Sequence, residues 1–181
     1  MKIQSPSWDD SREVWAAFRQ ACERHLEEMR GVLPDHVLEL AHLQGVDDGL
    51  IVEVHHDQAE RVLRITLRCG DLQMGYYDLI LTYGDAQITP EDEFLLARLA
   101  RSTIDQSDHD ADLYRHEVDV TAEGGIEHRL EFHVYRQHDV WIAIRCRMLS
   151  WEAVSRPNRD LPVMPDRFPD GPVTETGRLA R

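Results

Sequence analysis

The segment 62–83, VLRITLRCGDLQMGYYDLILTY, decides the fold of this 181-residue chain. Apolar side chains stand at every second position on both sides of a turn from Gly70 to Gly75, at Leu63, Ile65, Leu67, Cys69, Tyr77, Leu79, Leu81 and Tyr83. A period of two predicts extended strands that bury one face. A short turn with glycine between two such strands predicts an antiparallel pair.

The same alternation extends upstream and adds a strand before this pair. Leu50, Val52 and Val54 are expected on the buried face of that strand, and the polar turn 56–60 leads from it into the central segment. The three strands together predict a meander with one covered face, which is typical of antiparallel sheets.

A second three-stranded meander is predicted near the other end of the chain, at 114–120, 126–135 and 140–151. Glycines at 124 and 125 mark the first of its turns. Its last strand begins with VWIAIRC, which is apolar on both faces. Such a run favours a central or doubly covered strand.

Helical spacing dominates the first quarter of the chain. Segment 8–30 has an apolar stripe, and Ser7 with Asp10 three residues later is typical of a capping box. The stripe consists of Val14, Trp15, Phe18, Cys22, Leu26 and Met29. A short second helix is expected from Pro34 to near Gly45, since proline is tolerated in a first helical turn.

A third helix is predicted between the two meanders. Thr89 supplies a capping hydroxyl, Pro90 the first helical position and Glu91 an acid in the first turn, so that the helix begins there and continues to about Arg101. The acidic stretch 102–112 has no period and is expected to be a loop.

The fold class that follows is α+β. N-terminal helices are expected to pack on a mainly antiparallel sheet built from two three-stranded meanders joined by a helix, all in one domain over 1–151. The remaining segment, 152–181, contains five of the eight prolines and is expected to be an extended tail.

Charge disfavours several classes of partner. The net charge is −14, from 34 acidic and 20 basic side chains, and it repels both nucleic acid and anionic lipid. No run approaches the roughly 18 apolar residues that a membrane span needs.

Cys22, Cys69 and Cys146 are far apart, which favours reduced thiols and a cytoplasmic protein over a disulfide framework or a zinc site.

Histidines and acids in the turns are the first candidates for chemistry. His55-His56-Asp57 is the densest cluster, but adjacent strand residues point to opposite faces and cannot share one metal ion unless the strand has already turned. His138-Asp139 lies in another predicted turn and does not supply the missing ligands. Solvated turns are the preferred interpretation of both.

Segment 108–112, Asp-His-Asp-Ala-Asp, has the alternating acids of a calcium loop. The sixth position of that loop would be Leu113, where a tight turn requires glycine, and the twelfth would be Asp119, where a bidentate glutamate is expected. A solvated acidic loop fits these departures better than an EF-hand.

His116 and His128 fall in phase with the apolar side of their strands, so we expect both to be buried and close together. A hydrogen-bonded core pair is the preferred interpretation, and an acid-base site is the alternative. The opposite face would hold Glu117, Asp119, Glu127, Glu131 and His133.

No catalytic residue, cofactor-binding residue or metal ligand is assigned from the sequence, because it contains no serine-centred elbow, paired cysteine nucleophile, P-loop or GxGxxG motif. Trp15, Phe18, Trp141 and Trp151 are interpreted as packing residues, since a base-stacking platform accompanies a basic groove.

Several segments resemble a family of uncharacterised bacterial proteins, a domain of unknown function. The matching pieces lie between residues 33 and 145 and are Leu33-Pro34, Asp48-Gly49, Gly70 to Tyr83, Tyr114 to Asp119 and Glu127 to Phe132. The resemblance implies a fold and a bacterial origin, and no activity or cofactor. Asp47-Asp48 stands here where a His-Asp pair is usual in those relatives.

The preferred hypothesis for function is a non-enzymatic acidic protein that binds a basic protein, such as an immunity protein that neutralises a toxin. The acidic excess is concentrated in residues 1–60, with 13 acids and five bases, and would steer such a partner. A small metal-assisted hydrolase that uses the histidines and aspartates of the turns is one alternative. A subunit that assembles with copies of itself is another.

Overall fold

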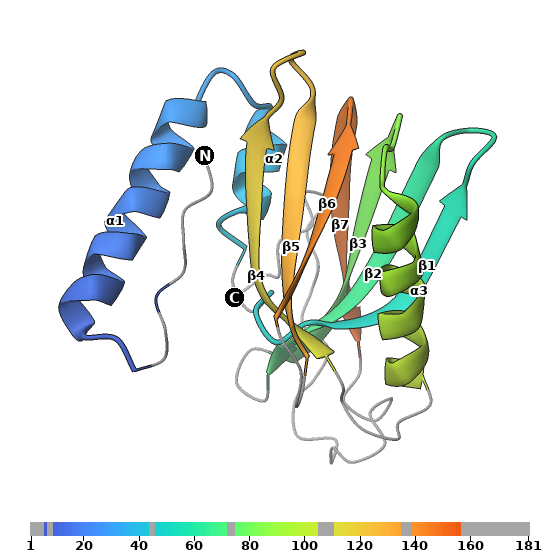
Figure 1. Ribbon diagram of the computed structural model, residues 1–181, viewed down its shortest axis with the longest axis horizontal. Coiled ribbons are helices and arrows are strands. Elements are labelled where there is room, and N and C mark those ends of the chain that lie inside the picture. The colour runs from blue at the N-terminus through green and yellow to red at the C-terminus, as the bar shows by residue number, and fades with distance from the viewer. Residues whose placement is uncertain are drawn as a thin grey trace.

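The computed structural model describes residues 6, 9–43, 46–71, 75–104, 111–134 and 139–156. Within these ranges the chain forms three helices and seven strands (Figure 1). In chain order they are α1 (Arg12–Met29), α2 (Asp35–Leu40), β1 (Leu50–Asp57), β2 (Val62–Asp71), β3 (Gly75–Gly84), α3 (Pro90–Ile104), β4 (Ala111–Val120), β5 (Ile126–Val134), β6 (Val140–Cys146) and β7 (Met148–Arg156).

Both predicted meanders are present, and helix α3 joins them. Strands β1, β2 and β3 pair antiparallel in sequence order, and so do β4, β5 and β6. They form two sheets, one with the order β1-β2-β3-β7 and one with the order β4-β5-β6. The α+β class with antiparallel strands is thereby confirmed.

The strand predicted at 140–151 is two strands that belong to different sheets. β6 ends at Cys146, and β7 begins at Met148 and pairs antiparallel with β3. Between them the Arg147 amide donates a hydrogen bond to the Gly84 carbonyl, 3.0 Å away, at the end of β3. Because β7 belongs to the other sheet, β6 is an edge strand of its own sheet. The expectation of a central strand is wrong for it.

β7 also reaches further than the sequence indicated. Residues 152–156, which were expected in the tail, continue this strand to Arg156. The rest of the expected tail, 157–181, lies outside the described residues.

Two single bridges connect the sheets at opposite edges. Gly49 bridges Leu113 next to the start of β1, and Gln87 bridges Arg145 beyond the end of β3. Each bridge is antiparallel and well formed, with N–H···O distances of 2.7 to 2.9 Å. The sheets thus enclose a shared core.

Segment 62–83 supplies the inner face of the larger sheet, as its alternation predicts. Every one of its alternating apolar residues is at most 2 % exposed: Leu63, Ile65, Leu67, Cys69, Tyr77, Leu79, Leu81 and Tyr83. Across the core lie Leu130, Phe132, Ile142 and Ile144 of the smaller sheet. Leu96 and Leu99 of α3 and Val37 and Leu40 of α2 complete the same cluster.

A bulge in β1 changes which of its residues face the core. The pairing with β2 shifts between Ile51 and Glu53, so that Ile51 lies opposite Leu67 and Val54 lies opposite Ile65. Ile51 is 1 % exposed, whereas Val52 is the extra residue. The predicted buried set of Leu50, Val52 and Val54 is wrong at its first two positions, because a bulge reverses the phase of a two-residue alternation.

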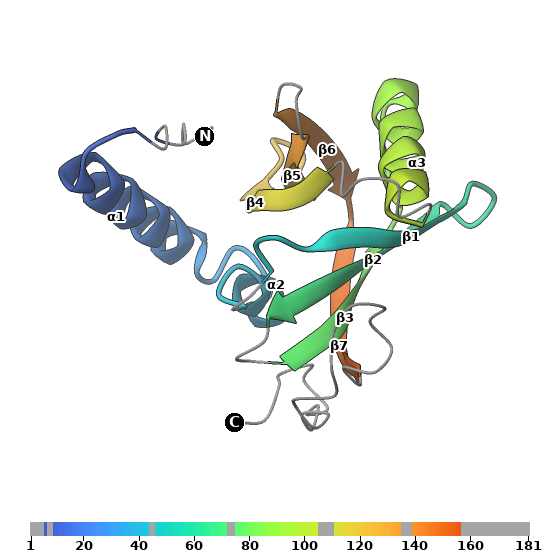
Figure 2. The ribbon, with the colours of Figure 1, turned by 90° about the horizontal axis from the view of Figure 1, so that it is seen from below.

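Helix α1 differs from the other helices in having no buried residue. It extends away from the sheets on the side opposite α3 (Figure 2). Ser11 caps it, with the Ser11 hydroxyl accepting a hydrogen bond from the Val14 amide. The helix therefore begins four residues later than predicted, and Ser7 of the expected capping box lies outside the described residues.

The stretch between α3 and β4 is shorter than expected. α3 continues to Ile104 and β4 begins at Ala111, so both ends of the expected loop 102–112 belong to regular structure. No helix among the described residues is long and apolar enough to cross a membrane. All three cysteines are free thiols, with Cys69 and Cys146 buried and Cys22 half-buried.

Candidate functional site

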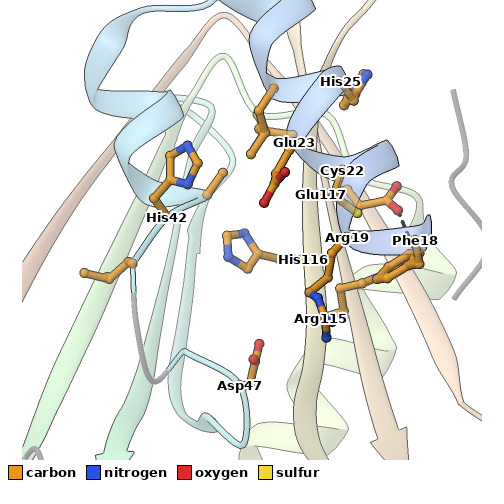
Figure 3. Close-up of a pocket in the computed structure, with 14 residues that line it drawn as sticks. Phe18, Arg19, Cys22, Glu23, His25, His42, Asp47, Arg115, His116 and Glu117 are labelled. Carbon is orange, nitrogen blue, oxygen red and sulfur yellow. Dashed lines mark ion pairs between the residues drawn. The ribbon is translucent and has the colours of Figure 1, made fainter. Parts of the chain in front are cut away.

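A pocket of about 460 Å³ lies between α1, the segment after α2, and β4 (Figure 3). Its lining comes from three parts of the chain: Phe18, Arg19, Cys22, Glu23, His25 and Leu26; Ala41, His42, Leu43 and Asp47; and Arg115, His116, Glu117 and Val118. A volume of this size is within the range of small-ligand sites.

The pocket lies along the edge of β4. It is lined by Arg115, His116, Glu117 and Val118, which are consecutive, and consecutive strand residues point to opposite faces. Figure 3 shows His116 projecting between His42 and Asp47, with Glu117 on the side of α1. A cavity that reaches both faces of one strand must pass along its edge.

A second pocket of about 370 Å³ continues the first. It is lined by Glu23, Leu26, Glu27, Arg30, Asp35, Leu38, Glu39 and His42. Glu23, Leu26 and His42 line both pockets, so the two are neighbours, one at the β4 edge and the other between α1 and α2. We call the two pockets together the edge groove.

His116 is the end nearest the groove in a hydrogen-bonded chain of three side chains. Its Nδ1 lies 3.2 Å from Nε2 of His128, and Nδ1 of His128 lies 2.9 Å from the hydroxyl of Tyr83. His128 is 1 % exposed and Tyr83 is fully buried. The expected hydrogen-bonded core pair is confirmed, and it extends across the core to the other sheet.

The direction of the hydrogen bonds follows from Tyr83. Burial raises the pKa of Tyr83 well above 10, so its hydroxyl keeps its proton. No other hydrogen-bond partner of this hydroxyl occurs in the described part of the chain, and buried hydroxyls use their donors. Tyr83 therefore donates to His128, His128 donates to His116, and His116 presents its Nε2–H to the groove.

Both histidines are neutral near pH 7. Burial lowers the pKa of His116 to about 4. Burial, and then the neighbouring His116, lowers the pKa of His128 well below its ordinary value. The inner wall of the groove is thus an uncharged hydrogen-bond donor, and it suits a carbonyl or similar acceptor.

The opposite face of the smaller sheet has a dense network of ion pairs. Arg129 contacts Glu117, Asp119 and Glu127 at 3.2 to 3.6 Å, and its side chain is 6 % exposed. Arg115 contacts Glu117 at 2.9 Å. All the acids that the sequence placed on this face are there, as predicted, and they are held by arginines.

Aromatic residues cover Arg115. Its guanidinium carbon lies 5.2 Å from the Phe18 ring centroid and 4.9 Å from that of Trp141, which are cation–π distances. Phe18 contacts Trp15 edge to face. Phe18 and Trp141 thus pack on Arg115 and not in the core, and Trp141 remains 36 % exposed.

Cys22 and Asp47 are two further groups of the groove whose pKa values differ from their ordinary ones. Burial raises the pKa of the Cys22 thiol, so it is not a thiolate at neutral pH. Desolvation, and then the charge of Asp48, raises the pKa of Asp47. His25 lies 3.9 Å from Asp119.

The turn histidines do not converge. His55 is exposed, while His56 is half-buried and lies 2.7 Å from Glu93 of α3, so the two adjacent side chains have separate surroundings. Asp139 contacts His133 at 2.7 Å, while His138 lies outside the described residues, as do Asp108, His109 and Asp110. Among the described residues no three histidine, cysteine or acidic side chains are placed to hold a metal ion.

Sequence reasoning identified His116 but not the rest of the groove. Glu23, His42 and Asp47 lie far from β4 in the chain, and no local pattern indicates that they meet it.

Comparisons with protein families, curated proteins and solved structures found no match for this chain.

Proposed function

We propose that this protein is a non-enzymatic binding module for a basic protein, and that its most concrete form is an immunity protein that neutralises a toxin. The observation that carries this proposal is the charge of the edge groove. Six acids line it, Glu23, Glu27, Asp35, Glu39, Asp47 and Glu117, against the three arginines Arg19, Arg30 and Arg115.

Two of these arginines already contact acids within the chain. Arg30 lies 3.0 Å from Glu27, and Arg115 lies 2.9 Å from Glu117. Each pair joins two residues that line the groove, so the excess of three acids over arginines is unchanged. Cationic side chains of a partner would find complementary charge there.

The charge of the whole chain supports the same proposal. A net charge of −14 attracts a basic protein over a distance and raises the rate of association at low salt. A toxin that cleaves nucleic acid needs a basic cleft, and an acidic inhibitor that fills it would block its substrate.

The test is binding to the product of the adjacent gene, measured as association rate against ionic strength. A double variant in the groove, Glu23→Gln with Asp35→Asn, should weaken binding about tenfold or more. Its matched control is Glu123→Gln with Glu152→Gln, which removes the same charge from exposed positions outside the groove and should change affinity less than twofold. Absence of binding at low salt, or equal losses in both variants, would contradict the proposal.

A further inference from the structure

The edge groove contains an unpaired strand edge, and this defines how a partner would bind. We infer that the groove takes an extended, basic peptide segment of the partner, which adds as a strand beside His116 and Val118 of β4. This inference rests on the proposed function and specifies its binding mode.

β4 is the outer strand of its sheet. It pairs with β5 on one side, and on the other side the strand pairing found among the described residues is the single bridge from Leu113 to Gly49. An outer strand presents a row of backbone donors and acceptors that another chain can pair with.

The hairpin after β4 shows which amides point outward. The Thr121 amide donates to the Gly125 carbonyl, 2.8 Å away, and this closes the turn between β4 and β5. Bonded pairs alternate with unbonded pairs in an antiparallel ladder, so Asp119 and Glu117 bond to β5. His116 and Val118 therefore direct their backbone N–H and C=O groups away from β5.

The Val120 amide confirms which backbone groups of β4 point away from β5. Val120 belongs to the same outward set, and its amide donates to the Asp119 carboxylate, 2.8 Å away, instead of to β5. For the amides of His116 and Val118 no such partner is found within the described part of the chain. Both residues line the groove, together with Arg115 and Glu117.

The groove has the walls that an added strand needs. One set of its side chains would face Phe18 and Leu26 of α1, and the other set would face His116 and Leu43. These walls are partly apolar, and the Nε2–H of His116 offers a further hydrogen bond to a carbonyl.

Charge selects the occupant. A second copy of this chain could pair edge to edge, but each copy has a charge of −14 and the two would repel. A basic segment is attracted instead, since Glu23, Glu27, Asp35 and Glu39 line the end of the groove between α1 and α2.

The experiment uses a synthetic hexapeptide, blocked at both ends, in which lysine and valine alternate. Two derivatives have N-methyl groups, one on the three lysines and one on the three valines. Charge and side chains are the same in all three peptides, but only every second amide of an added strand points toward β4. We expect one derivative to lose at least tenfold in affinity at low salt and the other to lose less than twofold.

A second readout locates the binding. Hydrogen exchange of the His116 and Val118 amides should slow at least tenfold with the bound hexapeptide, while exchange of the Val120 amide should not change. Equal affinities of the two methylated peptides would overturn strand addition and leave the proposed function intact. So would failure of the hexapeptide to bind while the adjacent gene product does bind. Protection of these amides by dimerisation alone would replace the peptide with a second copy and would overturn the inference.

Discussion

The Nδ1 atom of His116 lies 3.2 Å from Nε2 of His128, and this contact joins the wall of the edge groove to the core between the two sheets. Because His128 also contacts Tyr83 of β3, three side chains connect the groove with the larger sheet. In this series of hydrogen bonds each imidazole accepts with one ring nitrogen, so both histidines must be neutral. The first prediction follows from that requirement.

Stability should fall in mildly acidic solution. The pKa of His116 is about 4 in the folded protein and about 6.5 in the unfolded chain, so the unfolded chain binds the proton first as the pH falls. The stability contributed by neutral His116 is complete above pH 6.5 and is lost between pH 6.5 and 4. At pH 5 the loss from His116 is at most about 2 kcal/mol.

Urea unfolding at pH 7 and pH 5 measures this loss. His116→Gln should lose correspondingly less stability between the two pH values. His55→Gln, a control at an exposed histidine outside the groove, should lose as much as the unmodified protein. An equal loss in all three proteins would show that His116 titrates normally.

Tyr83→Phe should destabilise the protein by about 1 to 3 kcal/mol, because it leaves the buried Nδ1 of His128 without a donor. The double variant Tyr83→Phe with His128→Leu should cost less than the sum of the two single changes, since it removes both polar partners. Chemical denaturation of the four proteins gives the coupling energy. A strictly additive result would mean that the hydrogen bond contributes nothing.

Arg129 and Arg145 form a matched pair that tests how burial changes the contribution of an arginine–carboxylate contact to stability. Both contact Glu127, but the Arg129 side chain is 6 % exposed and that of Arg145 is 63 % exposed. Arg129→Met leaves several carboxylates together without their cation and should cost about 3 kcal/mol or more. Arg145→Met should cost less than about 1 kcal/mol. Thermal unfolding of both variants in the same buffer makes the comparison, and similar costs would contradict it.

Gly70 and Gly124 both have positive φ, and a comparison of their alanine variants distinguishes the cost of backbone strain from the cost of a steric clash. A Cβ atom at Gly70 would clash with the carbonyl oxygen of Gly75, whereas a Cβ atom at Gly124 would meet nothing within 4 Å. Gly124→Ala should cost about 1 kcal/mol through its φ of 79° alone. Gly70→Ala should cost at least about 2 kcal/mol more than that, because the strands β2 and β3 must separate. Equal melting temperatures of the two variants would exclude this effect.

Trp151 should anchor the short helix α2 to β7. Its indole N–H donates to the His36 carbonyl, 2.6 Å away, and Nε2 of His36 lies 2.8 Å from the Leu149 carbonyl. Trp151→Phe keeps a ring and removes the donor, so it should cost about 1 kcal/mol. Hydrogen exchange should accelerate in α2 before it does in β2 or β3. Unchanged exchange in α2 would show that this helix is held by Val37 and Leu40 alone.

Local alternation in the sequence determined much of this architecture. It gave both meanders, the inner face of β2 and β3, and the shared face of His116 and His128, because a strand's side chains alternate whatever lies around them. The third helix was equally local, since its start is defined by Thr89 and Pro90.

Tertiary structure alone decided the break at Arg147, the transfer of β7 to the other sheet and the bulge at Val52. A continuous apolar run cannot show where a strand changes partner, because that depends on the free edge that β3 offers. The edge groove is likewise a tertiary property. It brings Glu23, Asp47 and His116 together from distant parts of the chain, and no periodicity in the sequence encodes their distances.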